Sequence, residues 1–523
     1  MSKGGLFMRR IICAVTALLM LTMSVFPSYS GTAEEEADII EFDDETAIPL
    51  SCRPVSMADE CYYVSEYMPD NIQGQGLYGT CWAFSSVALA EISMIKNSVS
   101  DSSVDLSEGQ LIYNVYHTYE DPLGNMGDDK MHRWSGSWLS DGGSLMQTTM
   151  ALAAWKGIGD ESVVPYSSMD DDMTLTSEQQ SASLGILTEA RWFNMSQRDV
   201  VKNMIIQYGA VSASMYHNDR YFNEDAGAYY QNYTSKTNHA ITVIGWDDDY
   251  SASNFNYSPE GDGAWICRNS WGDWWGLDGY CYISYYDKAI SDSRAYSLEM
   301  TGKEVYDNNY QYDGGYYSGA MGLPSGYDFY NTFTATCDEE LRAAGIFMYS
   351  TDVEYSLQVY NRKTGEAMLS EPVTGCTQET GYYTVELPEP VALSEGDEFA
   401  VCFTITSADK YVYVMIDTSN SGLYYNYIAD NTNARSYYAP EYGNYESNAV
   451  SKKNSVLRIK ALTTKVKAIP GDINGDGGVN LSDLYALKQQ IAGSAEPDPA
   501  SDVNGDGTVN LADIYALRKI LLG

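Results

Sequence analysis

Basic residues are scarce in this chain of 523 residues. Lys and Arg together number 31 against 72 Asp and Glu, which gives a formal net charge of -41. A charge of this sign repels nucleic acid and anionic membrane surfaces. We therefore expect no nucleic-acid partner, whereas calcium ions and basic proteins remain open as partners.

Long hydrophobic runs are also lacking, with one exception near the N-terminus. The apolar stretch from Ile11 to Val25 follows two arginines, and small residues around Ser30 offer a cleavage site. This stretch is shorter than the roughly twenty apolar residues of a membrane-spanning helix. We predict a secretory signal peptide over residues 1–30, no membrane span in the mature protein, and a secreted, extracellular location.

Cysteine is too sparse for a scaffold built on disulfides. The chain has 9 cysteines, of which Cys13 lies in the predicted signal peptide. Spacing alone does not assign bridges among the others, which run from Cys52 to Cys402. If Cys81 is a free thiol, an odd number is left, so at least one more cysteine is unpaired or bonds to another molecule.

The chain divides into segments with different patterns, as its length leads one to expect. Residues 31–60 carry acidic runs and predict a flexible, solvated N-terminal segment. Residues 61–304 mix helical periodicity with strand-like apolar runs, which is an α+β pattern. Residues 305–466 lose the helical signal and alternate short apolar runs with turn residues, so they predict a β-sandwich.

The C-terminal segment, residues 467–523, contains an internal repeat. The stretch GDINGDGGVNLSDLYALKQQI returns as SDVNGDGTVNLADIYALRKIL, with Asp472 matching Asp502. Each copy spaces oxygen donors as an EF-hand calcium loop does, with glycine at the sharp turn. The candidate ligands are Asp472, Asn474, Asp476, Gly478, Asn480 and Asp483 in the first copy and Asp502, Asn504, Asp506, Thr508, Asn510 and Asp513 in the second.

We therefore expect two Ca2+ ions in this segment, with Gly478 and Thr508 contributing their carbonyl oxygens. The loops depart from the EF-hand because the last ligand is Asp rather than Glu and no helix enters the loop. A helix with one apolar face follows each loop. So small a core predicts a helical unit whose folding the metal completes. Plain turns rich in Asn and Asp are the alternative.

A single cysteine, Cys81, follows a glycine-rich turn in QGLYGTCWAFSS and begins an apolar run typical of a helix. It is a buried small hydrophobe, one half of a disulfide, or a nucleophile. A helix N-terminus favours the thiolate, and the side-chain amide of Gln75 is placed to donate to an oxyanion. The nucleophile hypothesis therefore needs a base.

Only 4 histidines are present. His239 opens the strand-like run HAITVIGW, so a rigid strand can hold its imidazole, whereas the other three lie in polar, less regular surroundings. Asn269 follows another strand-like run, and its carbonyl can accept the imidazole N–H and fix the ring tautomer. Trp271 would shield that hydrogen bond from water.

Taken together, these stretches resemble the papain-like cysteine proteases. The match continues in order through LSEGQLIYN, DGGSLMQTTMALAAWKGI, ESVVPY, NHAITVIGW and RNSWGDWWGLDGYCYI. The resemblance implies a two-lobed α+β peptidase domain over residues 61–304 with no cofactor for catalysis. It assigns Gln75 as the oxyanion donor, Cys81 as the nucleophile, His239 as the general base and acid, and Asn269 as the residue that orients His239, with Gly142, Gly143 and Trp271 in the substrate cleft.

The sequence departs from this family in several places. Tyr78 stands where relatives commonly have a cysteine, so that family disulfide is expected to be absent. The predicted base lies farther from Cys81 than the usual separation of about 130 to 150 residues. Insertions over 119–140 and 247–262 explain the separation and predict loops around the cleft. The stretch before the catalytic unit is too short for the helical propeptide of the family.

The C-terminal repeat resembles type I dockerins, which attach secreted enzymes to cohesin-bearing scaffold proteins such as those of cellulosomes. This implies a cohesin domain as the protein partner, with near-duplicate faces that allow two binding orientations. Family analogy places recognition at Leu481, Ser482, Lys488 and Gln489, or at the equivalent Leu511, Ala512, Arg518 and Lys519. Residues 305–466 look like the lectin-like β-sandwich that follows papain-like units in some bacterial proteins, and we assign them no ligand.

The sequence thus predicts a multidomain protein with a papain-like α+β domain, a β-sandwich and a small α-helical dockerin with two calcium loops. The predicted function is hydrolysis of protein or peptide substrates by a secreted cysteine peptidase docked on a scaffold or cell surface. The alternative is a non-catalytic attachment subunit of the same assembly that binds peptide or carbohydrate.

Overall fold

The chain forms two compact units in the computed structural model. One consists of Met1–Cys337 with Leu341–Thr464, and the other of Asp338–Glu340 with Lys465–Gly523. The structure describes residues 39–41, 61–127, 130–133, 137–314, 318–421, 425–443, 450, 455–466, 469–474, 478–494 and 499–522. The predicted signal peptide lies outside these ranges. Among the described residues, no helix is long and apolar enough to cross a membrane.

A helical lobe begins the larger unit and is built around α2 (Cys81–Lys96). Every residue of α2 from Trp82 to Met94 is buried, including the polar Ser85, Ser86, Glu91 and Ser93, so the helix is central to the lobe. The hydroxyl of Ser107 caps α3, and Ser144 forms a capping box on α4, because each accepts a free N–H of the first turn. The other helices of this lobe are α3 (Glu108–Tyr116), α4 (Leu145–Ala153) and α5 (Ser177–Ser181).

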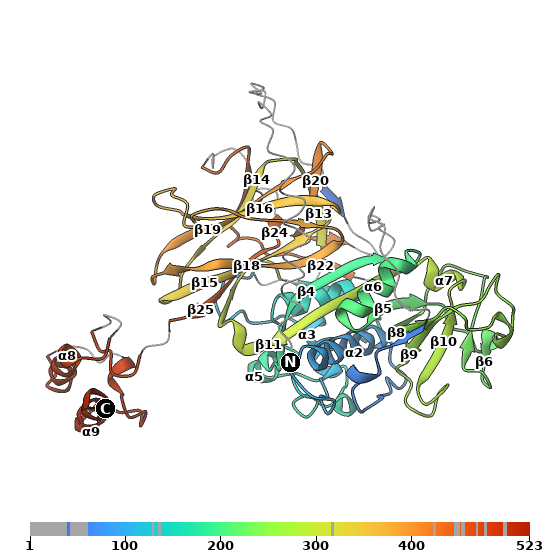
Figure 1. The fold of residues 1–523 in the computed structure, drawn as a ribbon, viewed down its shortest axis with the longest axis horizontal. Helices are drawn as coiled ribbons and strands as arrows, with labels where there is room; N and C mark the ends of the chain where they lie inside the picture. Colours follow the sequence, from blue (N-terminus) through green and yellow to red (C-terminus); the bar gives the residue numbers. More distant parts are fainter. Residues whose placement is uncertain are drawn as a thin grey trace. The chain divides into compact units, whose positions relative to one another are not determined.

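A mostly antiparallel sheet forms the second lobe and packs against α2 (Figure 1). Its main strands lie in the order β4-β11-β5-β8-β9-β10. Its elements are β2 (Cys61–Tyr63), β4 (Gly185–Asn194), α6 (Arg198–Tyr208), β5 (Val211–Met215), β6 (Phe222–Asn223), β7 (Ala228–Tyr229), β8 (His239–Asp247), β9 (Ala264–Arg268), β10 (Tyr280–Ser284), α7 (Lys288–Ser291) and β11 (Arg294–Gly302). The two lobes together give the α+β architecture that the sequence predicts.

The predicted β-sandwich follows β11. One of its sheets has the order β17-β16-β19-β14-β23, and the other joins β1, β13, β20, β24, β15, β25 and β12. The buried side chains of Phe329, Phe403 and Val412 lie in its core. Its strands are β12 (Asn308–Tyr310), β13 (Ser318–Pro324), β14 (Asp328–Thr334), β15 (Glu339–Met348), β16 (Val353–Asn361), β17 (Val373–Thr377), β18 (Thr380–Leu393), β19 (Glu398–Thr406), β20 (Tyr411–Thr418), β23 (Ser436–Ala439), β24 (Ser455–Leu457) and β25 (Ile459–Lys465).

The prediction of a solvated tail over residues 31–60 is wrong in one stretch. Ile39–Glu41 forms strand β1 and pairs with β13, with Ile39 opposite Met321. Two adjacent isoleucines have high β-propensity, and an open sheet edge offers unpaired backbone groups to such a segment. The other residues of the acidic segment up to 60 lie outside the described ranges.

The sandwich and the β-lobe share one core. Strand β18 pairs with β4 in antiparallel register, and Phe347 of the sandwich stacks on Trp192 of the lobe with ring centroids 5.9 Å apart. The buried guanidinium of Arg191 donates to the Tyr382 carbonyl oxygen at 2.5 Å and lies 3.5 Å from the centre of the Tyr383 ring. Glu189 of β4 forms an ion pair with the same guanidinium at 2.9 Å, so the lobe and the sandwich together surround this buried cation.

The inserted segment 119–140 also contacts the sandwich. Strand β3 (Lys130–Arg133) pairs with β22 (Tyr425–Ile428), which pairs with β21 (Asn420–Ser421). Gly127 approaches Asp430 so closely that an added Cβ would lie 1.7 Å from the Asp430 carbonyl oxygen. Backbone pairing therefore ties this insertion to the sandwich, which the sequence did not indicate.

The second compact unit contains α8 (Leu481–Ile491) and α9 (Leu511–Leu522). Leu487 and Leu517, one from each helix, are fully buried together with Ile473 and Ala500. Each helix thus contributes one apolar face to a small shared core, as the repeat predicts.

The shared core of the larger unit predicts that the catalytic lobes and the sandwich unfold together. All 10 tryptophans precede the sandwich in the sequence, so tryptophan fluorescence reports on the lobes alone. Phe403→Ala removes a fully buried ring from the sandwich's own core, which should cost about 3 to 5 kcal/mol and lower the urea midpoint measured by tryptophan fluorescence. Leu517→Ala in the other unit is the control and should leave that midpoint unchanged. An unchanged midpoint in Phe403→Ala would show that the two parts unfold independently.

Candidate active site

Cys81 is the first residue of α2, directly after the turn in which Gly76 adopts a φ of +63°. The Thr80 side chain does not cap the helix; its hydroxyl instead hydrogen-bonds the Tyr166 hydroxyl at 2.7 Å. The Sγ atom of Cys81 accepts a hydrogen bond from the backbone N–H of Ala240 at 3.4 Å. The sulfur therefore lies against the first residues of β8, the strand that His239 opens.

Burial raises the pKa of the Cys81 thiol, while the backbone N–H groups of Ala240, Trp82 and Cys81 itself lower it. The sequence predicts that the helix terminus favours the thiolate, but desolvation of the charged form is the larger effect here. Taken by itself, this burial disfavours an isolated thiolate at Cys81.

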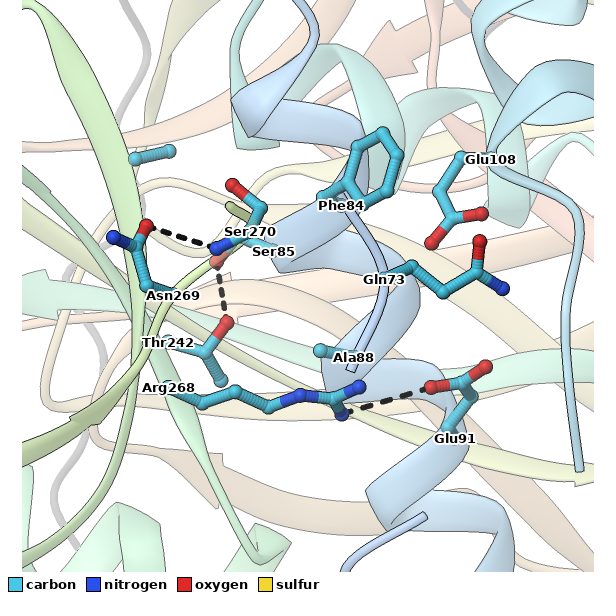
Figure 2. A pocket seen from close by; sticks show the side chains of 11 residues that line it. Gln73, Phe84, Ser85, Ala88, Glu91, Glu108, Thr242, Arg268, Asn269 and Ser270 are labelled. Atoms are coloured by element: carbon cyan, nitrogen blue, oxygen red, sulfur yellow. Dashed lines mark hydrogen bonds and ion pairs between the residues drawn. The ribbon is translucent and has the colours of Figure 1, made fainter. Parts of the chain in front are cut away.

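His239 and Asn269 form the central hydrogen bond of the site. The His239 Nε2 atom lies 2.7 Å from Asn269 Oδ1, and the backbone N–H of Ser270 donates to the same oxygen at 2.8 Å (Figure 2 shows the second bond). Because a backbone N–H is always a donor, the Ser270 bond identifies the amide oxygen of Asn269. That oxygen must then accept from His239 Nε2–H, so the proton of the neutral ring is on Nε2 and Nδ1 is left as the basic nitrogen.

The pKa of His239 is lowered to about 4, chiefly because burial disfavours the imidazolium; the Asn269 bond raises it and the charge of His217 lowers it. The indole of Trp271 stacks on the His239 ring with centroids 4.6 Å apart. At neutral pH the ring is uncharged and able to accept a proton, and Trp271 covers it as the sequence predicts.

Gln75 is fixed at both ends of its amide. Its Nε2 donates to the Tyr78 carbonyl oxygen at 2.8 Å, and its Oε1 accepts from the Ser270 hydroxyl at 2.7 Å. Its backbone carbonyl also accepts from the Tyr166 hydroxyl at 2.8 Å. The nitrogen carries two hydrogens and Tyr78 takes one, so the second is available to an oxyanion near Cys81.

The two predicted cleft glycines lie beside α2. A Cβ on Gly143 would come within 2.3 Å of the Trp82 ring, and Gly142 adopts a φ of +78°, so both positions demand glycine. Gly79 N donates to the Leu139 carbonyl oxygen at 3.0 Å, which joins the segment before Gly142 to the turn before Cys81. The contacts bring all seven predicted catalytic and cleft residues to one region.

Sequence reasoning missed several contributors to this site. The N–H of Ala240 is a backbone group and has no residue signature. Ser270, which links Gln75 to Asn269, and Tyr166, which ties Gln75 to Thr80, both lie inside matched stretches, but nothing in the stretches gives their roles. His217 is a further partner, because its ring meets Trp271 edge to face at 4.5 Å.

A charged pocket adjoins Asn269 on the side of α2 (Figure 2). Arg268 lies 3.8 Å from Glu91, and Gln73 and Glu108 line the same space. Burial raises the pKa of Glu91 to about 7 although Arg268 lowers it, and burial together with the charge of Glu91 raises the pKa of Glu108 well above its usual value. Burial therefore opposes the ionised form of both carboxyl groups, and Arg268 favours the ionised form of Glu91.

In the first C-terminal loop, Asp483 is fully buried and its carboxylate accepts from the backbone N–H groups of Ile473, Asn474 and Asn480 at 2.8, 3.0 and 2.8 Å. Asp472 is also buried. Asp476 lies outside the described residues, so the complete ligand set of this loop cannot be traced.

The second loop is described throughout. Asp513 accepts from Asn504 N and Asn510 N, and the Asn504 amide donates to Asp506 at 3.0 Å. Gly507 has a φ of +82°, as the sharp turn requires. The donors are hard carboxylate, amide and carbonyl oxygens, which suit Ca2+. Within the described part of the chain, no three His, Cys, Asp or Glu side chains are already gathered as a closed metal site.

Large apolar side chains are exposed on both C-terminal helices. Leu481 and Leu511, two predicted partner residues, are 74% and 69% exposed. Tyr485 and Tyr515 occupy equivalent positions one turn further along and are 65% and 72% exposed. The two tyrosines were not predicted, although the repeat places them on the same helix face as the leucines. Exposed apolar pairs of this kind are typical of interaction sites.

Family models match three parts of the chain. The model of papain family cysteine proteases matches residues 64–298, the lectin-like domain model matches residues 309–463, and the type I dockerin domain model matches residues 470–522.

Known proteases are similar to the first of these parts. A cysteine protease of Blomia tropicalis is 27% identical over 218 residues, which cover 40% of this chain and 56% of that protein. Ananain of Ananas comosus is 26% identical over 217 residues, which cover 41% of this chain and 52% of that protein. The chain spans about half the length of these curated relatives.

Solved structures of Cwp84 share the fold over a longer stretch. The crystal structure of the cysteine protease and lectin-like domains of Cwp84, a surface layer associated protein of Clostridium difficile, has a TM-score of 0.66 and 22% identity, and covers 80% of this chain and 91% of that chain. A structure of Cwp84 after propeptide cleavage has a TM-score of 0.63 and 24% identity, and covers 76% and 97%. The Cwp84 structures share the fold, and the family models identify a papain family cysteine protease domain over residues 64–298 of this chain, ahead of a lectin-like domain and a type I dockerin domain.

Proposed function

We propose that this chain is a secreted cysteine peptidase that hydrolyses peptide bonds and is anchored by its C-terminal unit to a cohesin-bearing scaffold of the cellulosome type. The observation that carries the peptidase proposal is the 2.7 Å bond from His239 Nε2 to Asn269 Oδ1, next to a sulfur held by the N–H of Ala240. This arrangement leaves His239 Nδ1 as the basic ring nitrogen, on the residue next to the Ala240 N–H that binds the thiol, and nucleophilic catalysis by cysteine needs such a base.

In the proposed reaction, Cys81 Sγ attacks the carbonyl carbon of the scissile peptide bond while His239 Nδ1 takes the thiol proton. The carbonyl oxygen becomes an oxyanion and accepts hydrogen bonds from Gln75 Nε2 and from the Cys81 backbone N–H. His239 returns the proton to the leaving amine, which breaks the C–N bond and leaves a thioester. A water molecule, deprotonated by His239, then hydrolyses that thioester and restores the thiol.

Burial explains why proton transfer inside the pair is favoured over ionisation of either group alone. A single charge on Cys81 or on His239 is disfavoured by desolvation, as the directions of both pKa shifts indicate. Transfer of a proton from sulfur to Nδ1 creates two opposite charges in contact, whose attraction is strong where water is excluded. The closed surroundings thus favour a charge pair during reaction.

The docking part of the proposal rests on the dockerin match, the paired oxygen-rich loops and the exposed residues of the two helices. Ca2+ bound by the twelve predicted ligands would neutralise the loop carboxylates and hold each helix against its loop. Leu481 with Tyr485, or Leu511 with Tyr515, would contact the cohesin.

Replacing the nucleophile tests the peptidase proposal directly. Cys81→Ala should lower hydrolysis of a protein substrate by at least about a thousandfold, because no other group supplies the attacking sulfur. Cys402→Ala is the matched control: it removes another buried cysteine, in the sandwich, and should leave the rate unchanged. An epoxide that alkylates activated thiols should modify Cys81, as located by peptide mass spectrometry. Full activity in Cys81→Ala would end the assignment, and a folded wild type that neither cleaves nor reacts would favour the non-catalytic attachment subunit.

The pH dependence of kcat/KM tests the role of His239 as the base. The folded-state pKa of His239 is lowered to about 4, so the neutral base is present above that pH and is lost as the pH falls through it. We expect an acid limb near pH 4. In Asn269→Ala the bond that raises this pKa is gone, so the limb should move to lower pH while kcat/KM at pH 7 falls roughly ten- to a hundredfold.

Ser270→Ala is the control for that shift, because the backbone N–H that orients Asn269 remains. Its acid limb should stay where the wild-type limb lies, even if loss of the hydroxyl that holds Gln75 slows the reaction. A limb that does not move in Asn269→Ala would contradict the proposed coupling between the two side chains.

Metal removal and surface substitution test the docking proposal. A calcium chelator should abolish binding to a cohesin domain in calorimetry, and added Ca2+ should restore it. The double variant Tyr485→Ala with Tyr515→Ala should weaken binding by about 2 kcal/mol or more with no change in helix content, because both rings are exposed. Either single variant should bind nearly as well as the wild type if the two faces are interchangeable. Unchanged binding in excess chelator would contradict metal-dependent docking.

A further inference from the structure

Two cysteines face each other on β9 and β10, the strands joined by residues 269–279. We call this connection the Asn269 hairpin. Strands β9 and β10 are antiparallel, and their register places Cys267 directly opposite Cys281. The backbone N–H of Asn269 donates to the Gly279 carbonyl oxygen at 2.9 Å, so the cysteine pair, two residues further along each strand, is again a hydrogen-bonded pair. Such pairs have Cα atoms about 5.5 Å apart, which lies inside the range of about 4.4 to 6.8 Å found for disulfides. Their Cβ atoms lie up to about 5.5 Å apart and must approach by roughly 1 Å for the bond to close.

The two thiols are in contact with each other. Directly opposed residues of an antiparallel pair point to the same face of the sheet, and both side chains lie in the core of the catalytic unit, 0% and 1% exposed. Burial raises the pKa of Cys267, and a side-chain hydrogen bond with Cys281 raises it further. Both cysteines are free thiols in the structure.

The hairpin that these strands carry is irregular. Between the two cysteines, Gly272, Gly276, Asp278 and Gly279 all have a positive φ. The same stretch carries Asn269 and Trp271, on which the tautomer and the shielding of His239 depend. Regular ladder hydrogen bonds therefore hold the base of the hairpin, and the functional residues lie just beyond it.

We propose that Cys267 and Cys281 are an oxidation site that forms a cross-strand disulfide at the base of the Asn269 hairpin. The oxidant is a small or protein disulfide such as glutathione disulfide. One cysteine thiolate attacks a sulfur of glutathione disulfide and releases one glutathione; the other cysteine then attacks the mixed disulfide and releases the second. The pair loses two electrons and two protons, and the glutathione disulfide becomes two glutathione thiols. Because the thiols are buried, exchange requires opening of the hairpin or takes place during folding.

The chain offers a direct test by peptide mapping. Trypsin cleaves after Lys236, Arg268 and Lys288, so Cys267 falls in the peptide 237–268 and Cys281 in the peptide 269–288. The Cys81→Ala protein is used, so that the proposed nucleophile takes no part and peptidase activity is not needed. It is refolded in glutathione disulfide, acid-quenched, denatured, alkylated and digested without reductant. We expect the two peptides to run as one species, lighter than their sum by two hydrogen atoms, and to separate on reduction.

Variants and a stability measurement complete the test. Cys267→Ala should abolish the linked species, whereas Cys402→Ala, at another buried cysteine, should leave it in place. Oxidation of the Cys81→Ala protein should raise its melting temperature by roughly 5 °C, and this rise should be absent in the variant that also carries Cys267→Ala. Recovery of both cysteines fully alkylated after refolding with oxidant would overturn the proposal, and it would do so whether or not the chain is a peptidase.

Discussion

The active site depends on one amide oxygen that accepts two hydrogen bonds. Asn269 Oδ1 receives the backbone N–H of Ser270 and the Nε2–H of His239. If the amide were turned over, its Nδ2 would face the Ser270 N–H, an obligatory donor that would then be buried without an acceptor, at a cost of about 1 to 3 kcal/mol. The native orientation is kept even though Asn269 Nδ2 finds no hydrogen-bond partner among the described residues. The local N–H of Ser270 therefore sets the tautomer of a histidine on a neighbouring strand, and Trp271 protects that choice by covering the ring.

Desolvation governs the charges around this bond. Burial opposes ionisation of Cys81, His239, Glu91 and Glu108 alike, while the buried cation Arg268 favours the ionised form of Glu91. The sequence alone suggested a stored thiolate, because the helix terminus is visible in the sequence while the depth of burial is not. Beside the sulfur, the fields that act on a new ion pair include those of oriented dipoles: the backbone N–H groups near the sulfur and the amides of Gln75 and Asn269. Such dipoles are held in place by the fold and need little reorganisation during reaction.

The sequence predicts the position of a residue best when its chemistry requires one amino-acid type at the end of a helix or strand. Cys81 at a helix start and His239 at a strand start are of this kind, and the structure brings the sulfur to the N–H of Ala240, next to His239. What it missed depends on contacts between distant segments. The pairing of β18 with β4, the addition of β1 to the sandwich and the opposition of Cys267 to Cys281 are matters of strand register, and register is set by the whole sheet rather than by local pattern. The hydrogen bond from the Ala240 N–H to the sulfur could not be predicted for a different reason. Every residue except proline carries a backbone N–H, so the sequence does not mark the one that donates.

The sandwich reaches both lobes of the papain-family domain. Through β18 it extends the sheet of the β-lobe at β4 and supplies the carbonyl and the ring that surround the buried charge of Arg191. Through β22 it pairs with β3, in the insertion that leaves α3 and returns as Gly142 and Gly143. The proposed active site joins α2 of the helical lobe to β8 of the β-lobe, so an element fixed by backbone pairing to one lobe and to the segment that leads to Gly142 and Gly143 restrains the separation of the two. A lectin-like sandwich attached at a single point could move freely beside the protease domain. One that is paired at two points is part of the framework that holds Cys81 against the N–H of Ala240.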